Sequence, residues 1–205
     1  MHDFRDSLAK SHAAEDLPLW REVYEKAFPF FQEMLNHRMD GEHQRAGVDR
    51  SIILYNSKQI LIDENVRFKN EKTGKVYTDI LLEYLSDVQR KQPGWVCKPL
   101  RCDYIAYAIA PIGKCYLMPV PALQTAWAKY GSKWIEDFPI CDAHNTTWTT
   151  RSVAVPVAAL FPALGEMLRV NFTPTNGVAT EFPQSPMQHT AEELNDPDIA
   201  RWLDR

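Results

Sequence analysis

The sequence has no long apolar run. None of its stretches approaches the roughly 18 consecutive apolar residues that a membrane-spanning helix needs. The first residues, Met-His-Asp-Phe-Arg-Asp, also lack the apolar core of a secretory signal peptide. We therefore expect a cytoplasmic protein without a membrane segment.

Glycine and paired cysteine motifs are scarce as well. Only eight glycines occur, and none belongs to a phosphate-cradling loop or to the Gly-x-Ser-x-Gly elbow of serine hydrolases. The four cysteines include no Cys-x-x-Cys pair. Cys141 and His144 have the spacing of two zinc ligands, but no second pair completes a tetrahedral set, so we expect reduced, structural cysteines.

What is present is an ordinary globular composition. With 205 residues, 45% hydrophobic and 24% charged, the chain suits one domain with a full core. We place that domain at residues 1–170. Residues 171–205 begin with a stretch rich in Pro, Thr, Asn and Gln, so we expect an extended loop followed by a short acidic helix.

Charge is distributed unevenly along the chain. The net charge is −4, yet residues 45–101 hold eleven Lys and Arg against seven Asp and Glu. A local positive excess suits contact with phosphates, which dominate nucleic-acid affinity. The residues that we assign to DNA binding are Arg67, Lys69, Lys98, Arg101 and, by base stacking, Trp95. The alternative is that these charges are solvated and that the tryptophan is packed.

Residues 47–67 predict a β-hairpin that carries acids on one face. The two runs Ser51–Tyr55 and Gln59–Arg67 are rich in β-branched and apolar residues. Between them, Asn56-Ser57-Lys58 is typical of a turn. We therefore expect a three-residue loop at this position.

This loop places Asp49 opposite Asn65, with Asp63 two residues away on the same face. Hard cations take oxygen ligands, usually one or two carboxylates together with waters and substrate phosphates. We therefore expect Mg²⁺ or Mn²⁺ at Asp49 and Asp63. A two-residue loop would instead slip the register by one and make Glu64 the ligand.

The same residues resemble the PD-(D/E)XK nuclease signature, in which an acid on one strand faces an acid-x-lysine on the next. Asp49 is followed, after thirteen residues, by Asp63-Glu64-Asn65. The resemblance is to bacteriophage-type members of the superfamily and covers roughly residues 16–130. It implies an α/β fold with a mixed central β-sheet flanked by helices, a restriction-endonuclease-like αβββαβ core, and C-terminal additions.

Asn65 departs from that signature, because the family has lysine at this position. In the family the lysine helps to orient the attacking water. An amide can hydrogen-bond to a water but carries no positive charge. Catalysis would therefore rest on Asp49, Asp63 and Asn65, with slow or undetectable cleavage.

The segment before the hairpin predicts a helix. Apolar residues recur at helical spacing from Leu17 to Arg38, interrupted at Pro29. In the resembling family an acid of the first helix often supplies an additional metal ligand, and Glu22 and Glu25 are the candidates here. The alternative is a solvated carboxylate on an amphipathic helix.

A third strand is predicted over Val76–Tyr84, after a turn. Glu83 stands in its apolar run, where a carboxylate needs a partner or a metal. We therefore include Glu83 among the candidate metal ligands.

Two strand-to-helix passages are predicted further along the chain. A second hairpin is expected from Asp103–Ala110 and Lys114–Val120. The pattern Tyr116–Leu123 is then echoed by Val153–Leu160, each an apolar strand that continues through proline into a helix. We expect both passages to lie in one sheet.

Taken with the resemblance, these features predict a metal-dependent DNA phosphodiesterase, either an endonuclease or an exonuclease, encoded by a phage and acting in the host cytoplasm. The alternative is a nuclease-like module that no longer cleaves and instead captures a host protein or nucleic acid. Asn65 and the net acidity favour the alternative.

Overall fold

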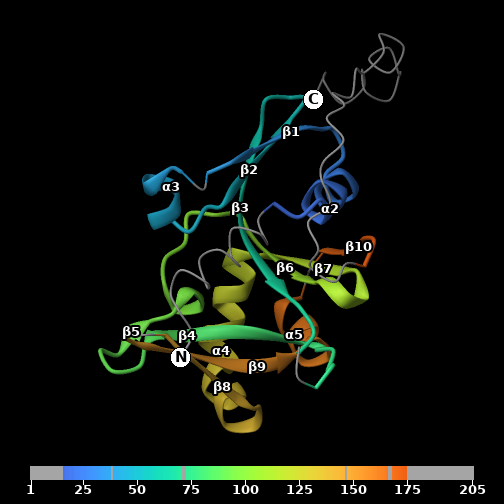
Figure 1. Ribbon diagram of the computed structural model, residues 1–205. Coiled ribbons are helices and arrows are strands. Elements are labelled where there is room, and N and C mark those ends of the chain that lie inside the picture. Colours follow the sequence, from blue (N-terminus) through green and yellow to red (C-terminus); the bar gives the residue numbers. More distant parts are fainter. Residues whose placement is uncertain (1–15, 38, 71–72, 146, 166–167, 175–205) are drawn as a thin grey trace.

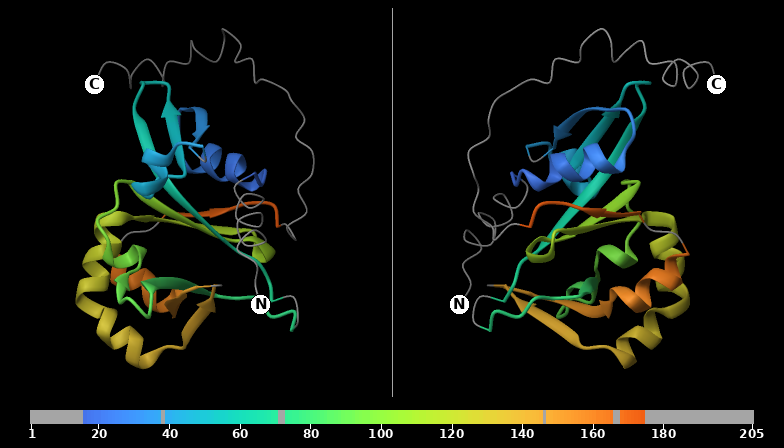
Figure 2. Two further views of the ribbon diagram at one scale, coloured as in Figure 1. Left: turned by 60° about the vertical axis from the view of Figure 1, so that its left-hand side comes forward. Right: turned by 90° about the vertical axis from the view of Figure 1, so that its right-hand side faces the viewer.

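The computed structural model describes residues 16–37, 39–70, 73–145, 147–165 and 168–174. Two β-sheets and several helices make up this part of the chain (Figures 1 and 2). The loop and acidic helix predicted at the C-terminus lie almost entirely outside the described residues. No helix in the described ranges is long and apolar enough to cross a membrane.

The larger sheet has six strands in the order β1-β2-β3-β6-β7-β10. Its strands are β1 (Phe31–Asn36), β2 (Arg50–Leu54), β3 (Gln59–Arg67), β6 (Tyr104–Ile109), β7 (Lys114–Pro119) and β10 (Leu168–Asn171). Strand β3 runs parallel to β6, whereas the other neighbours are antiparallel. The predicted class, an α/β fold with a mixed sheet flanked by helices, is confirmed.

The smaller sheet has four antiparallel strands in the order β5-β4-β9-β8. Its strands are β4 (Asp79–Asp87), β5 (Gln92–Pro93), β8 (Ile140–His144) and β9 (Thr149–Pro156). The helices are α2 (Leu19–Ala27), α3 (Gly41–Arg45), α4 (Val120–Asp137) and α5 (Val157–Leu164), with short 3-10 turns η1 (Trp95–Cys97) and η2 (Ala110–Ile112).

Two hydrophobic cores lie on opposite faces of the six-stranded sheet. One core fills the space between α2 and the sheet, and includes Trp20, Ile52 and Ile62. The other joins the second face to the four-stranded sheet and to α4 and α5, and includes Ile105 and Leu82. Because side chains alternate along a strand, consecutive residues of β3 face different cores.

The helix predicted over residues 17–38 is wrong in its second half. Helix α2 ends at Ala27, and the chain continues as edge strand β1, which pairs antiparallel with β2. Pro29 cannot continue a helix, and Phe30 adopts a positive φ of 69° that redirects the chain. The apolar residues after Phe30 fit a strand because β2 offers them hydrogen-bonding partners.

The third predicted strand exists but belongs to the other sheet. Strand β4 pairs with β5 and β9, and the strand beside β3 is instead β6. The chain leaves the larger sheet after β3 through a turn in which Gly74 has a φ of 66°. Buried Ile80 and Leu82 then pack in the core between the sheets.

The second hairpin and both strand-to-helix passages are confirmed. Strands β6 and β7 pair around η2, β7 runs into α4, and β9 runs into α5. Proline precedes each helix, at Pro119 and Pro156, where a missing N–H costs no helical hydrogen bond. The expectation of one common sheet is wrong, because β7 and β9 lie in different sheets.

Candidate functional site

The hairpin that carries the candidate acids is formed by β2 and β3. Its loop contains three residues, as predicted, but they are residues 55–57, because the Leu54 N–H donates to the Lys58 carbonyl oxygen at 3.0 Å. The pairing of Arg50 with Ile62 makes Asp49 and Asp63 the next residues along the two strands. The predicted opposition of Asp49 to Asn65 is therefore wrong by two residues. A shift of two keeps every side chain on its predicted face.

Asp49 and Asp63 lie on the face of the larger sheet that looks toward the smaller sheet. Asp49 Oδ2 accepts a hydrogen bond from the Glu64 backbone N–H at 2.8 Å, so its carboxylate reaches across to β3. Asp63 Oδ1 accepts a hydrogen bond from the Asn65 amide at 3.1 Å. Gly47, with a φ of 70°, allows the chain to turn past Asp63 Oδ2 and Leu100 just before Asp49.

The electrostatics of Asp63 are unusual for an aspartate. Desolvation raises the pKa of Asp63 well above its ordinary value, and the charges of Asp49 and Glu64 raise it further. The hydrogen bond from Asn65 opposes this shift but does not cancel it. A desolvated acid that repels its neighbours keeps its proton unless a cation compensates the charge.

Glu83 approaches the same acids from strand β4 of the smaller sheet. Its charge also contributes to raising the pKa of Asp63. Burial raises the pKa of Glu83 itself, against Lys98 and the Trp95 backbone N–H, which lower it. The segment before Trp95 lies directly on β4, since a Cβ at Gly94 would stand 2.2 Å from the Glu83 carbonyl oxygen. The structure thus places Asp49, Asp63 and Asn65 on adjacent strands, with Glu83 near enough to affect the pKa of Asp63 and with Lys98 near Glu83.

Glu64 lies on the opposite face of the larger sheet. Its side chain is only 1% exposed and accepts hydrogen bonds from Arg50 Nε at 2.6 Å and Arg50 Nη2 at 3.0 Å. Tyr24 of α2 donates a third hydrogen bond at 2.6 Å. Burial raises the pKa of Glu64 to about 7, against these three bonds. Glu64 is therefore a partner of Arg50 and Tyr24, and cannot join Asp63 in one site.

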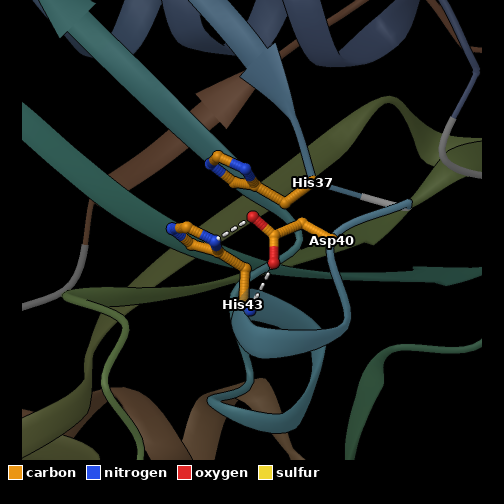
Figure 3. Close-up of side chains that lie close together, drawn as sticks. All are labelled: His37, Asp40 and His43. Carbon is orange, nitrogen blue, oxygen red and sulfur yellow. Dashed lines mark hydrogen bonds and ion pairs between the residues drawn. The ribbon is translucent and has the colours of Figure 1, made fainter.

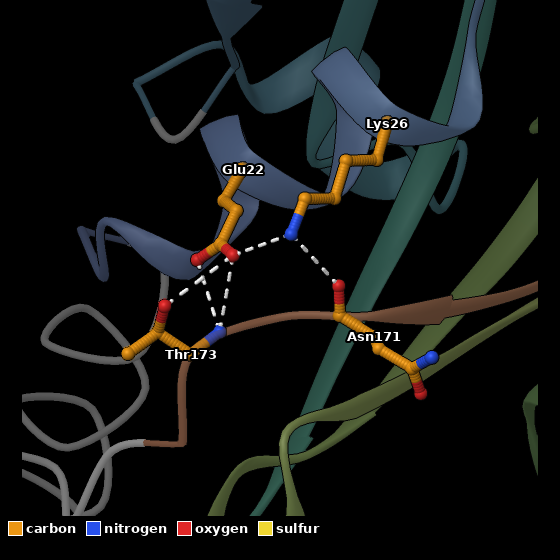
Figure 4. A network of polar contacts seen from close by, with 4 residues as sticks. All are labelled: Glu22, Lys26, Asn171 and Thr173. Carbon is orange, nitrogen blue, oxygen red and sulfur yellow. Dashed lines mark hydrogen bonds and ion pairs between the residues drawn. The ribbon is translucent and has the colours of Figure 1, made fainter.

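Glu22 is occupied by contacts between α2 and the end of β10 (Figure 4). It lies on α2 and accepts hydrogen bonds from the Thr173 backbone N–H at 3.0 and 3.1 Å and from Lys26 at 2.7 Å. Lys26 in turn donates to the Asn171 carbonyl oxygen at 3.2 Å. These contacts fasten α2 to the end of β10, which is the edge strand of the larger sheet farthest from β2.

The residues assigned to DNA binding divide into two groups. Arg67 is ion-paired with Asp79 and stacked on Tyr77 at 3.7 Å, and its side chain is 11% exposed. Trp95 packs against the core between the sheets, as its alternative interpretation holds. Lys69, Lys98 and Arg101 are exposed and can reach a ligand in solution.

A further cluster was not predicted from the sequence. His37, Asp40 and His43 lie side by side between β1 and α3 (Figure 3). They are the one group of three or more His, Cys, Asp or Glu in the described residues whose ligand atoms all lie within 4.8 Å of one another. The ligand atoms of Asp49, Asp63 and Glu83 do not all lie within this distance of one another. The spacing His-x-x-Asp-x-x-His is the sequence pattern that could have indicated this cluster.

The cluster lies close to the acidic site. The His37 backbone N–H donates to the Asp49 carbonyl oxygen at 2.9 Å. Burial and the neighbouring His43 lower the pKa of His37. The histidine cluster is therefore joined to Asp49 through the backbone.

Comparison of the chain with protein-family models, with curated proteins and with solved structures finds no match.

Proposed function

We propose that this protein is a metal-dependent DNA phosphodiesterase of the restriction-endonuclease-like type, in which Asp49 and Asp63 hold Mg²⁺ or Mn²⁺. The observation that supports the proposal most strongly is the position of these two acids on adjacent strands, with the pKa of Asp63 raised by desolvation and by Asp49. Bringing two carboxylates together costs free energy in the absence of a cation. Such a cost is expected where a cation binds.

The residues present fit a hard divalent cation. Mg²⁺ commonly takes one or two carboxylates and completes its coordination with waters and substrate phosphates, so Asp49 and Asp63 suffice. The ligand atoms of Asp49, Asp63 and Glu83 do not all lie within 4.8 Å of one another, so at least one of the three would bind through a water. The bound ion would polarise a phosphoryl oxygen and lower the pKa of a coordinated water.

The chain itself would contribute positioning and charge. Asn65 orients the Asp63 carboxylate through its amide, but supplies no positive charge. Lys98 is the cation beside Glu83, and it is exposed, so it can contact the substrate phosphate. Lys69 and Arg101 would hold the nucleic-acid backbone through charge alone.

A second candidate is a nuclease-like module that binds a host protein or nucleic acid without cleaving it. The hydrogen bond from Asn65 to Asp63 favours the binding module. A neutral amide lies next to Asp63, at the position where the resembling nucleases carry lysine. The two candidates differ in whether restoring that charge creates activity.

The proposed activity can be tested by nicking of supercoiled DNA in Mg²⁺ or Mn²⁺. We expect slow or undetectable nicking by the native protein and measurable metal-dependent nicking by Asn65→Lys. The gain should disappear in Asn65→Lys/Asp63→Asn and persist in Asn65→Lys/Glu136→Gln, whose second change is exposed on α4.

Two outcomes would contradict the proposal. Robust native cleavage that survives both Asp49→Ala and Asp63→Ala would place the chemistry elsewhere. A folded Asn65→Lys variant without any nicking would favour the binding module.

A further inference from the structure

The segment that leads from the end of β1 into α3 carries three potential metal ligands, of which His43 lies in α3 itself. The Asp40 backbone N–H donates to the His37 carbonyl oxygen at 2.8 Å. Asp40 Oδ1 accepts hydrogen bonds from the backbone N–H groups of Glu42 at 2.9 Å and His43 at 3.2 Å. These bonds position the Asp40 carboxylate and fix the backbone of His37 and His43 on either side of it.

The side chains converge on one side of this turn. His43 Nδ1 lies 2.7 Å from Asp40 Oδ2, the carboxylate oxygen that does not cap α3. The His37 and His43 rings are stacked, with centroids 3.9 Å apart and planes within 6° of parallel. Figure 3 shows both rings lying beside the Asp40 carboxylate. The side chains of His43 and Asp40 are 36% and 45% exposed, so an ion can enter from solution.

We propose that His37, Asp40 and His43 form a binding site for a divalent transition-metal ion of the Zn²⁺ class. Imidazole nitrogens suit Zn²⁺, Ni²⁺ and Cu²⁺, whereas Mg²⁺ and Mn²⁺ prefer oxygen ligands. The site therefore differs in chemistry from the Asp49 and Asp63 pair and does not depend on the proposed nuclease activity.

The distances suit a single ion. Zn²⁺ bonds to nitrogen and oxygen are roughly 2.0 to 2.2 Å long, so two ligand atoms of one ion lie at most about 4.4 Å apart. The three ligand atoms here are within 4.8 Å of one another, so small side-chain rotations are enough to close the site. The histidine rings would tilt out of their parallel stack.

Hydrogen bonds behind the three potential ligands also support the proposed metal site. His37 Nε2 lies 2.6 Å from Ser51 Oγ, and Ser51 Oγ also accepts a hydrogen bond from the Gln59 amide at 2.6 Å. A ligating histidine usually holds a hydrogen-bond partner on its other nitrogen, which fixes the ring. When the His37 Nε2–H donates to Ser51 Oγ, Nδ1 keeps its lone pair for a metal. Three protein ligands leave the fourth tetrahedral position open for water or a ligand.

Zn²⁺ titration by calorimetry, and Co²⁺ titration by visible absorption, test the site on the full chain. We expect binding of a metal ion whose affinity falls about tenfold or more in His37→Gln and in His43→Gln. His144→Gln is the matched control, because His144 lies on β8 and contacts Thr149. It should bind as the native protein does.

Two further variants distinguish this site from the Asp49 and Asp63 pair. Asp40→Asn keeps an oxygen that can cap α3 but removes the carboxylate, so its Zn²⁺ affinity should fall while its metal-free melting temperature changes little. Asp63→Asn should leave Zn²⁺ binding unchanged even where it abolishes Mg²⁺-dependent behaviour. Native affinity in His37→Gln and His43→Gln, or an equal loss in His144→Gln, would overturn the proposal.

Discussion

Asp63 links the proposed cation site to the stability of the metal-free protein. Desolvation and the charge of Asp49 raise its pKa in the folded state, whereas in the unfolded chain the pKa returns to its ordinary value. Above that ordinary value, the folded protein holds a proton that the unfolded chain has lost. The free energy of unfolding therefore decreases as the pH rises, until the raised pKa is passed.

Asp63→Asn should flatten this pH dependence. Urea unfolding between about pH 5 and 8 without metal should show a shallower fall in stability than in the native protein, by up to about 1.4 kcal/mol per pH unit. Burial of Glu64 also raises its pKa, to about 7, and contributes a fall of the same sign in both proteins, so their difference isolates Asp63. Equal slopes in the two proteins would show that Asp63 ionises normally.

The sequence was a better guide to which residues form the candidate site than to which residues pair across the hairpin. The sequence predicted Asp49 and Asp63 on one face, and the structure places them there. It did not predict that the loop begins one residue earlier, because both Asn56-Ser57-Lys58 and Tyr55-Asn56-Ser57 contain turn-forming residues. Ser57, with a φ of 61°, fits the left-handed position of the observed loop.

At the scale of elements, the Arg50 and Glu64 pair joins β2 to β3 beneath α2. The side chains are 5% and 1% exposed, and Tyr24 donates a hydrogen bond to the same carboxylate. A buried pair of this kind contributes little net stability over apolar residues of similar size, but removing one partner leaves the other charge buried and uncompensated.

Arg50→Met alone should therefore destabilise the protein by about 3 to 5 kcal/mol, because Glu64 is left buried without its cation. Arg50→Met/Glu64→Leu should recover most of that loss in urea unfolding. Arg151→Met serves as the control, since Arg151 pairs with Asp142 at the surface and should cost less than about 1 kcal/mol. A double variant as unstable as Arg50→Met would argue against charge as the cause.

Element type and element partner were predictable to different degrees. Proline positions correctly indicated where β7 and β9 pass into helices, because proline suits the first helical turn. The apolar alternation of β4 correctly indicated a strand. It could not indicate which sheet receives the strand, since Ile80 and Leu82 would be buried equally well beside β3 or beside β9.

At the scale of the whole molecule, the net negative charge disfavours binding to DNA, whereas the local positive charge favours it. The chain carries −4, but Lys98 and Arg101 lie together in the exposed segment near Glu83 and Asp63. Electrostatic contact with phosphates depends on local cations and weakens with salt.

Lys98→Glu/Arg101→Glu should weaken binding to DNA of every sequence and reduce the slope of log K against log salt by about two. Fluorescence anisotropy with single- and double-stranded oligonucleotides measures both quantities. Lys129→Glu/Lys133→Glu, on exposed positions of α4, makes the same change in net charge and should have a smaller effect. Equal losses would indicate a nonspecific charge effect, and no binding at low salt would favour a protein partner.

The three residues of the β2–β3 loop act as a spacer for a site that lies well away from them. Asp63 stands five residues beyond Lys58, which is roughly 17 Å at the rise of a strand. A shift of β3 by one residue past β2 would exchange the faces of Asp63 and Glu64. Asp63 would then lie beside Arg50, and Glu64 would lie beside Asp49. The register in which the loop joins the two strands is thus as much a part of this site as its side chains.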